Sequence, residues 1–337
     1  MSAAQPTTTP IRVLDLHCDT LDCLANGSAV EPFELVDFDE QSVLEPHLNR
    51  NLQINDLNIS LDTIGTLQWC QSFAIFISDR FRGNLAWHYY QQVHQYFVDQ
   101  LAEHSSRLAQ VQSSRDIDQA FAHQQCAALL AIEGAAFFTD SLAPIAQIAA
   151  DGVKLLTLVW NGQNALASGI EASGGLSNFG RQVVAALEQE RIIVDVSHLN
   201  DEGFGDLLNV AERPFIASHS NSRALCGHPR NLTDDQFRAI RDRGGIVGLN
   251  YYNRFLVEEE RPATPDDLLR HLDHWLELGG ERAIALGSDY DGSDIADWLR
   301  PCSQVTVLRE RASEAFGTEI ANQLFFENAY RFFATNL

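Results

Sequence analysis

Eight short apolar runs punctuate this chain, and their spacing constrains its fold more than any other feature. Strands that are buried on both faces read as continuous aliphatic and β-branched runs rather than as alternating patterns. In parallel α/β barrels such strands alternate with helices, and a single barrel can account for all 337 residues. The runs are IRVLDL (11–16), SFAIFI (72–77), CAALLAI (126–132), VKLLTLV (153–159), RIIVDV (191–196), RPFIAS (213–218), GGIVGLN (244–250) and RAIALG (282–287).

The segments between the later runs carry the signals of helices that return the chain to the next strand. Residues 233–243 open with Thr233 in a capping-box sequence. Residues 264–278 place Pro265 at the first helical position, and both helices are expected to end at a Gly-Gly pair. We therefore expect an α/β fold, a single (β/α)₈ TIM-type barrel, with residues 319–333 as an amphipathic closing helix.

The domain organisation follows from the absence of an internal divider in the sequence. No repeat, low-complexity tract or Pro/Gly/Ser-rich linker separates two halves. We expect residues 1–10 to be a flexible N-terminal segment and residues 11–337 to form the barrel. Residues 20–72 read as a long connection, and insertions of that length at a catalytic rim usually shape substrate access. Without a secretory signal or a run of 18 apolar residues, a cytoplasmic protein is the expectation.

The net charge limits the partners to be expected, and the cysteine pattern argues against disulfides. The formal net charge is −23, which opposes binding to phosphate backbones and anionic lipid surfaces. We therefore expect neither a nucleic acid nor a membrane as partner. The six cysteines contain no CxxC pair, and buried reduced thiols are expected rather than a disulfide framework.

Residues able to bind a metal follow several of the runs. His17 and Asp19 follow the first run, Glu133 ends the third, and His198 and His219 follow two consecutive later runs. Alternate residues of a strand share a face, so His17 and Asp19 are expected to project together into the barrel mouth. Imidazoles and carboxylates suit Zn²⁺ or another borderline divalent ion. The structural alternatives are a core histidine bonded to a nearby aspartate and a salt bridge at Glu133. The repetition at several strand ends favours metal binding.

The last run is followed by GSDYDG, which offers two further carboxylates. Asp289 comes directly from the end of the last strand, beside the first strand of a barrel. A carboxylate at that place can accept and return the proton of an attacking water. Asp291 competes for this role but lies farther out on the loop.

The motifs together resemble the membrane (renal) dipeptidase family of zinc dipeptidases, within the amidohydrolase superfamily. The resemblance extends over nearly the whole chain in the right order. The motifs that carry it are DLHCDT (15–20), IEGA (132–135), GVKLLTLVWN (152–161), IIVDVSHL (192–199), PFIASHSNSRALCGHPRNLTDDQ (214–236), GGIVGLNYYN (244–253), GSDYDG (287–292) and ENAYRFF (327–333). The SHSNSRAL and HPRNLTD segments are the most specific of these.

The resemblance implies a binuclear zinc centre. By that resemblance His17, Asp19 and Glu133 bind one Zn²⁺, while Glu133, His198 and His219 bind the other, with Glu133 bridging. A metal-activated hydroxide would then hydrolyse a dipeptide, with L,D-dipeptides among the plausible substrates. Two ions about 3.5–4 Å apart are a known arrangement for activating water.

The resemblance also assigns the remaining roles. Asp289 handles the proton, Arg230 grips the carboxylate at the substrate's C-terminus, and Tyr252 contacts the substrate, although packing explains that tyrosine equally well. A guanidinium fork matches a carboxylate, which supports the role of Arg230. A homodimer is a further expectation from the family.

One position departs from the family pattern. The best understood members carry a histidine that polarises the substrate carbonyl, where this chain has Trp160. Tryptophan offers a single N–H donor and no charge. Trp160 and Asn161 are therefore candidate substrate contacts, with Asn164 an alternative donor. Another metal-dependent reaction, such as N-acyl amino acid or lactone hydrolysis, is the first alternative function, and a non-catalytic scaffold is the second.

Overall fold

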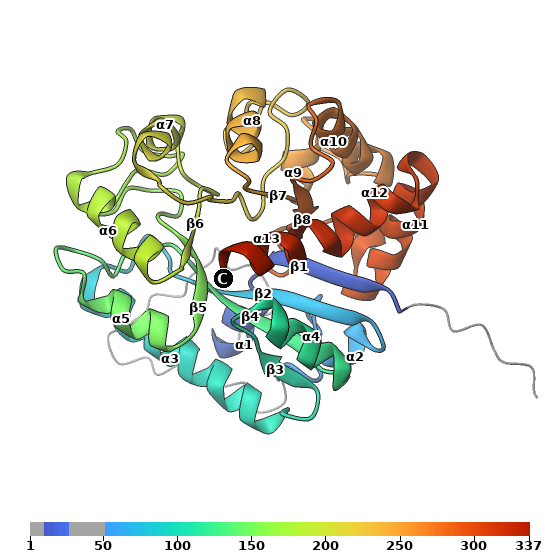
Figure 1. The fold of residues 1–337 in the computed structure, drawn as a ribbon, viewed down its shortest axis with the longest axis horizontal. Coiled ribbons are helices and arrows are strands. Elements are labelled where there is room, and N and C mark those ends of the chain that lie inside the picture. Colours follow the sequence, from blue (N-terminus) through green and yellow to red (C-terminus); the bar gives the residue numbers. More distant parts are fainter. Residues whose placement is uncertain (1–9, 27–50) are drawn as a thin grey trace, which may run out of the picture.

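The computed structural model describes residues 10–26 and 51–337 and shows an α/β fold built on one curved sheet of parallel strands (Figure 1). The strands run in the order β6-β5-β4-β2-β1-β8-β7, and β3 pairs with β4 off this path. Helices lie around the outside of the sheet (Figure 1). The strands are β1 (Arg12–Cys18), β2 (Gln68–Phe76), β3 (Leu108–Gln110), β4 (Cys126–Glu133), β5 (Val153–Thr157), β6 (Ile193–Asp195), β7 (Val247–Leu249) and β8 (Ile284–Leu286).

Seven of the eight predicted runs contain a regular strand, whereas residues 213–218 do not. This segment forms only isolated parallel bridges, Ile216 to Asp195 and Ala217 to Val247. Pro214 has no backbone N–H to donate. The N–H of Ser218 donates to a side-chain carboxylate instead of a neighbouring strand. The described residues therefore show a curled parallel sheet in which one of the eight predicted runs, residues 213–218, is not a regular strand.

Strand β3 has no counterpart among the predicted runs. Its three residues, Leu-Ala-Gln, pair in parallel with the first three residues of β4. So short a segment without a β-branched residue carries no periodic signal.

The predicted helices agree closely with the observed ones. Thr233 and Thr264 both make the N-terminal capping boxes of their helices, α8 and α10. Residues 319–333 fall in α12, a π-helical turn (Gln323–Glu327) and α13. The α-helices are α1 (Thr20–Asn26), α2 (Leu61–Ile64), α3 (Gly83–Glu103), α4 (Ser114–Ala122), α5 (Ala143–Ala150), α6 (Asn178–Gln189), α7 (Asp201–Val210), α8 (Asp234–Asp242), α9 (Asn253–Leu256), α10 (Pro265–Glu277), α11 (Val305–Phe316), α12 (Thr318–Asn322) and α13 (Asn328–Asn336).

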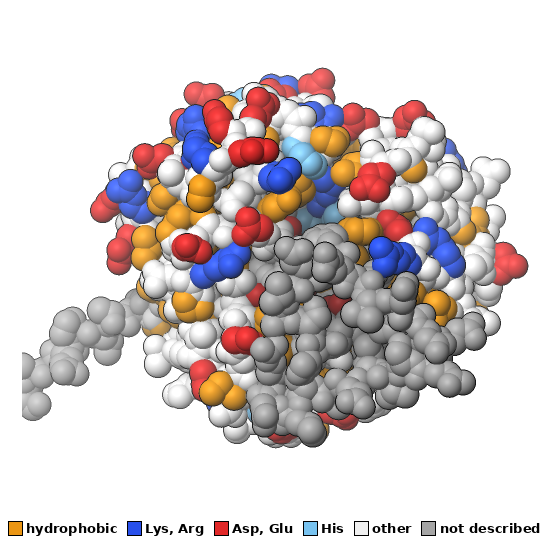
Figure 2. Space-filling view, turned by 180° about the vertical axis from the view of Figure 1, so that it is seen from behind, with side chains coloured by type: hydrophobic (Ala, Val, Ile, Leu, Met, Phe, Trp, Pro, Cys, Tyr) orange, Lys and Arg blue, Asp and Glu red, His pale blue; other side chains and the backbone are white. Residues whose placement is uncertain are grey.

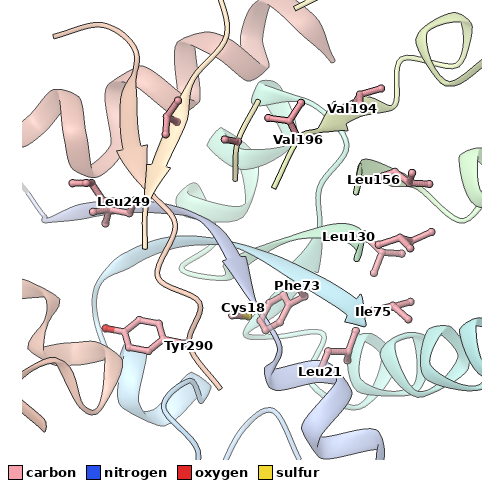
Figure 3. Packing of buried hydrophobic residues seen from close by; sticks show 14 of the residues in the cluster. Cys18, Leu21, Phe73, Ile75, Leu130, Leu156, Val194, Val196, Leu249 and Tyr290 are labelled. Carbon is pink, nitrogen blue, oxygen red and sulfur yellow. The ribbon is translucent and has the colours of Figure 1, made fainter. Parts of the chain in front are cut away.

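The hydrophobic core has two parts, which take alternate residues of the central strands. In β4, Ala128 and Leu130 belong to the larger part, and Ala127 and Leu129 belong to the smaller. Figure 3 shows Leu130 extending from its strand among side chains of neighbouring strands in the larger part. The smaller part includes Phe333 of α13, so the last helix packs on the other side of the sheet. Strands buried on both faces explain the continuous apolar runs of the sequence.

The surface of the protein carries charged side chains of both signs. Acidic and basic side chains are dispersed over one face, and histidine side chains are visible in a hollow of it (Figure 2). Among the described residues no helix has both the length and the apolar character needed to cross a bilayer. All six cysteines are buried and free, as expected from the sequence. Of the N-terminal segment predicted to be flexible, residues 1–9 lie outside the described residues, as do residues 27–50 of the long connection.

Candidate active site and metal centre

Five buried side chains meet at the carboxyl ends of the strands. His17 comes from β1 and Asp19 from the turn after it, and Glu133 is the last residue of β4. His198 follows β6, and His219 follows the bridged segment 213–218. All five are less than a tenth exposed. The neighbouring Cys18 packs into the larger part of the core, so it points away from this group.

The distances show that Glu133 lies at the centre of the cluster. Its Oε1 is 2.6 Å from Nε2 of His198 and 3.5 Å from Nε2 of His219. Its Oε2 is 3.5 Å from Nε2 of His17, which in turn lies 3.3 Å from Oδ2 of Asp19. The rings of His17 and His219 have centroids 3.9 Å apart. The sequence-predicted ligands are therefore brought together in one cluster.

Burial and mutual charge set the protonation of these groups. Burial works against ionisation of Glu133, but His17 and His198 outweigh it and hold the pKa of Glu133 well below its usual value. Burial, assisted by Arg230, lowers the pKa of His198 to about 4. Burial also lowers the pKa of His219, with His17 adding to the effect. The neutral imidazoles of His198 and His219 and the ionised carboxylate of Glu133 are forms that ligate metals. At His17, by contrast, burial is outweighed by Asp19 and Glu133, which raise its pKa.

The donor set fits a divalent metal ion. Two overlapping groups offer ligand atoms within 4.8 Å of one another: His17, Glu133 and His219, and His17, Asp19 and Asp289. Oδ1 of Asp19 and Nε2 of His17 are buried and have no hydrogen-bond partner in the described part of the chain. Buried polar atoms of this kind are costly unless something binds them. Nitrogen and carboxylate oxygen donors suit zinc.

Asp289 rather than Asp291 faces the cluster. Oδ2 of Asp289 accepts a hydrogen bond of 2.9 Å from Nδ2 of Asn250, and burial raises the pKa of Asp289 to about 6. The carboxylate of Asp291 instead accepts from the hydroxyl of Thr20 and from the backbone and side chain of Asn58. The carboxylate of Asp291 therefore holds the connection between β1 and β2, whereas that of Asp289 lies in the group with His17 and Asp19.

No side chain fits at Gly292, which follows these carboxylates. A Cβ there would lie 1.9 Å from Oδ2 of Asp19 and 2.6 Å from Oδ1 of Asp289. The glycine lets the loop backbone pass close over the two acidic groups.

The cluster opens into a cavity of about 930 Å³. Arg230 is buried in its wall, and its Nε has no hydrogen-bond partner among the described residues. Its guanidinium carbon lies 5.4 Å from the centre of the Phe255 ring. Tyr252 is half-buried in the same wall. Asp56, Leu57 and Asn58 also line the cavity, so part of the long connection borders it as the sequence predicted.

Trp160 and Asn161 line the cavity next to His198, but they contact the protein in different ways. Trp160 packs edge-on against Phe76 with centroids 5.1 Å apart, and its ring centre lies 6.2 Å from that of His198. Oδ1 of Asn161 is 2.8 Å from Nδ1 of His198. Asn164 is engaged elsewhere, because its side chain bonds Leu158 and the backbone of residues 166 and 167.

Sequence reasoning missed the carboxylates that lie beneath the cluster. Asp15 accepts hydrogen bonds from the backbone and hydroxyl of Ser288, and Asp195 accepts the same pair from Ser218. Both aspartates lie inside apolar runs, where a carboxylate is buried and must be bonded. A charged residue inside an apolar run was therefore the sequence signal that could have identified these two aspartates.

A buried group of imidazoles and carboxylates at the carboxyl edge of a parallel sheet, opening into a cavity, defines a metal-dependent hydrolase. The family model of the membrane dipeptidases, peptidase family M19, matches residues 1–335. The chain belongs to this family, as its motifs indicated, and is a metal-dependent dipeptidase.

The chain is also similar to one curated protein and to solved structures. An uncharacterized protein in the pqqA 5′ region of Klebsiella pneumoniae is 37% identical over 214 residues, or 60% of this chain and 79% of that protein. The structure of dipeptidase AC, a metallopeptidase of family M19, matches with a TM-score of 0.84 and 23% identity over 97% of this chain and 99% of that one. A Rhodobacter sphaeroides metallopeptidase, liganded with a phosphinate mimic of L-Ala-D-Ala, matches with a TM-score of 0.84 and 24% identity over 98% and 100% of the two chains. The two structures share the α/β fold of this chain, with its curled parallel sheet.

Proposed function

We propose that this chain is a binuclear zinc dipeptidase whose substrates include L,D-dipeptides. The observation that carries the proposal is the convergence of three histidines, His17, His198 and His219, on Glu133, with Asp19 beside His17. Glu133, Asp19 and His198 line a cavity whose wall also holds Arg230. The L-Ala-D-Ala mimic bound to the Rhodobacter sphaeroides relative supports the substrate class.

In this proposal His17, Asp19 and Glu133 would hold one zinc ion, and Glu133, His198 and His219 would hold the other. The contacts of the two Glu133 oxygens support this division, since Oε2 lies near His17 and Oε1 near His198 and His219. Zinc supplies a Lewis acid that polarises a carbonyl oxygen and makes water acidic enough to ionise near neutral pH.

Arg230 binds and orients the substrate. Its guanidinium is buried in the cavity wall, and burial lowers its pKa only to about 10, so the side chain stays charged at neutral pH. Arg230 has no bonded carboxylate among the described residues, and the free carboxylate of a dipeptide would match it, since two parallel N–H donors fit two oxygens. Tyr252 stands in the same wall and would border the substrate.

Asp289 handles the proton of the reaction. Asn250 holds its Oδ2, which fixes the carboxylate beside His17 and Asp19. From there it would accept a proton from the attacking water and deliver it to the nitrogen of the departing amino acid. Trp160 would form an apolar wall near the scissile bond, in the place where the family resemblance expects a histidine.

The fold is proposed to close into a (β/α)₈ barrel over residues 11–337. The bridges of Ile216 to Asp195 and of Ala217 to Val247 support this, because they set residues 216–217 between the two end strands of the sheet. In that arrangement the segment 213–218 takes the place of an eighth strand.

A substrate panel with zinc-loaded protein tests the function. We expect cleavage of L-Ala-L-Ala and L-Ala-D-Ala that a chelator abolishes and that zinc restores. N-acetyl-L-alanine and a γ-lactone belong in the same panel, because Trp160 in place of a histidine leaves the carbonyl environment changed. Turnover of the acylated amino acid or the lactone, with none of the dipeptides, would replace the proposed substrate class. Metal-replete protein inactive on the whole panel would favour a scaffold.

A further inference from the structure

The two cluster histidines that share Oε1 of Glu133 are held from behind by different partners. Nδ1 of His219 lies 2.7 Å from the hydroxyl of Ser218, which itself donates to Asp195. Nδ1 of His198 lies 2.8 Å from Oδ1 of Asn161. In both rings Nε2 is the nitrogen that faces Glu133. A ring can offer the Nε2 lone pair to a metal only when its proton is on Nδ1, so the outer partner of each ring must accept a hydrogen bond.

Two hydrogen bonds and one close packing contact hold the backbone at Asn161. The carbonyl oxygen of Asn161 accepts a 2.8 Å hydrogen bond from the N–H of Glu171, and the next residue, Gly162, donates 2.6 Å to Oδ2 of Asp79. A Cβ on Gly169 would lie 2.5 Å from the carbonyl oxygen of Asn161, so the backbone there is packed to contact. These contacts fix the backbone from which the Asn161 side chain reaches His198.

His198 needs such a support more than His219 does. Its backbone has a φ of 73°, a region that few residues other than glycine adopt. Contacts with the surrounding chain must hold a histidine in this conformation, as is common where a side chain has to point in one direction. The Asn161 amide is the group that meets the outer nitrogen of this ring.

We propose that Asn161 is a positioning residue for His198, which fixes the ring and its proton so that Nε2 can hold one ion, and that it is not primarily a substrate contact. This proposal differs from the sequence interpretation, which placed Asn161 among the substrate-binding residues. The inference rests on the proposed zinc centre. Asp79 belongs to the same support, because it anchors the turn through Gly162.

Three variants at position 161 separate the two roles. Asn161→Leu has the same shape without an acceptor, Asn161→Ala removes the side chain, and Asn161→Asp keeps an oxygen in place. Zinc affinity is measured by competition with a chromogenic chelator, and the number of ions kept after dialysis is measured by metal analysis. We expect the Leu and Ala variants to bind one ion about 10–100-fold more weakly, and the Asp variant to bind it as tightly as the wild type. Visible spectra of the cobalt-substituted proteins report the same ligand field.

The control is Glu171→Gln, which changes another residue of the cavity wall whose backbone contact to Asn161 is kept. It should leave zinc affinity unchanged. Thermal unfolding of the metal-free proteins shows whether each variant folds. If the Leu variant does not fold, the zinc affinities of the Ala and Asp variants distinguish the two roles of Asn161. Unchanged zinc affinity in both the Leu and Ala variants, together with a raised KM for dipeptides, would overturn the proposal and restore the substrate role. Failure of the wild type to hydrolyse dipeptides would count against the proposed function. The zinc affinities of the wild type and the variants could still be compared.

Discussion

Ser218 donates both its backbone N–H, at 2.9 Å, and its hydroxyl to the buried carboxylate of Asp195. The same hydroxyl lies 2.7 Å from Nδ1 of the next residue, His219. Because the hydroxyl proton is given to Asp195, its oxygen accepts from the ring, and Nε2 of His219 is left with a free lone pair. Through the hydroxyl of Ser218, Asp195 thus fixes the tautomer of His219, a candidate zinc ligand.

The same construction recurs on the other side of the cluster. Asp15 accepts the backbone N–H of Ser288, at 2.8 Å, and the hydroxyl of that serine. Asp289 is the next residue, as His219 is next to Ser218. Each buried aspartate therefore holds the chain of a neighbouring strand end directly before a residue of the cluster. The cost of burying a carboxylate is offset by several hydrogen bonds to it.

The first prediction tests the link between Asp195 and His219. Ser218→Ala should lower the free energy of unfolding by about 1–3 kcal/mol, because a buried carboxylate loses one donor. It should also weaken zinc binding about tenfold or more, since His219 loses its outer acceptor. Urea unfolding of the metal-free protein and chelator competition measure the two effects. The matched control is Ser220→Ala, two residues on, where the buried hydroxyl makes no hydrogen bond among the described residues. Equal losses in both variants would show that the Asp195 link contributes nothing specific.

The second prediction concerns Asp289. Asp289→Asn keeps the shape and the contact with Asn250 but cannot accept a proton, so kcat should fall about 10²–10⁴-fold. Metal content should stay at the wild-type level. Steady-state kinetics with L-Ala-D-Ala and metal analysis after dialysis are the measurements. Loss of an ion would make Asp289 a ligand, which its place in one of the two candidate metal groups allows, and activity near that of the wild type would remove its proton-handling role.

The third prediction concerns the carboxylate site. Arg230→Ala should raise KM for free dipeptides about 10²-fold, while the corresponding dipeptide amides, which lack the carboxylate, should be affected little. The ratio of kcat/KM between acid and amide is therefore the informative quantity. Arg300, which is exposed at the cavity rim and paired with Asp294, offers a matched control, and Arg300→Gln should leave that ratio near its wild-type value. A ratio unchanged in Arg230→Ala would place the carboxylate elsewhere.

Local signals in the sequence predicted the regular elements well. The capping boxes that begin at Thr233 and Thr264 are present, since each depends on residues within one turn. Residues at strand ends were predicted to meet because parallel strands bring their carboxyl ends together, and Glu133 and His17 do so.

What the sequence left open depends on contacts between distant segments. The contact of Asn161 with His198 joins two loops 37 positions apart, and nothing local distinguishes that asparagine from Asn164. The positive φ values of His198 and Asp289 have the same origin, since both are imposed by the surrounding chain. The segment 213–218 bridges both neighbouring strands without forming a regular strand, and the N–H of Ser218 donates to the side chain of Asp195, a contact that no local pattern indicates.

The last prediction concerns stability against pH and rests on His271, which lies in α10 away from the cluster. Its Nδ1 accepts from the N–H of Ser222 and its Nε2 donates to the carbonyl of Leu256, both at 3.1 Å, so the neutral ring is fully used. Burial lowers the pKa of His271 to about 4, from an ordinary value of 6.5. Between these values the unfolded chain binds the proton and the folded chain does not. The stability that His271 contributes is therefore complete above pH 6.5 and is lost as the pH falls toward 4, by at most about 3 kcal/mol.

The variant His271→Gln isolates this effect from the titration of other groups. At pH 7.5 it should be less stable than the wild type by about 1–3 kcal/mol, because the buried hydrogen bonds are disturbed. The difference should narrow steadily between pH 6.5 and pH 4.5, since only the wild type loses the contribution of a neutral ring there. Urea unfolding of the metal-free proteins over this range measures it, with His274→Gln, three residues along the same helix, as the control for removing a half-buried histidine. A stability difference that is constant over the range would mean that His271 keeps an ordinary pKa despite its burial.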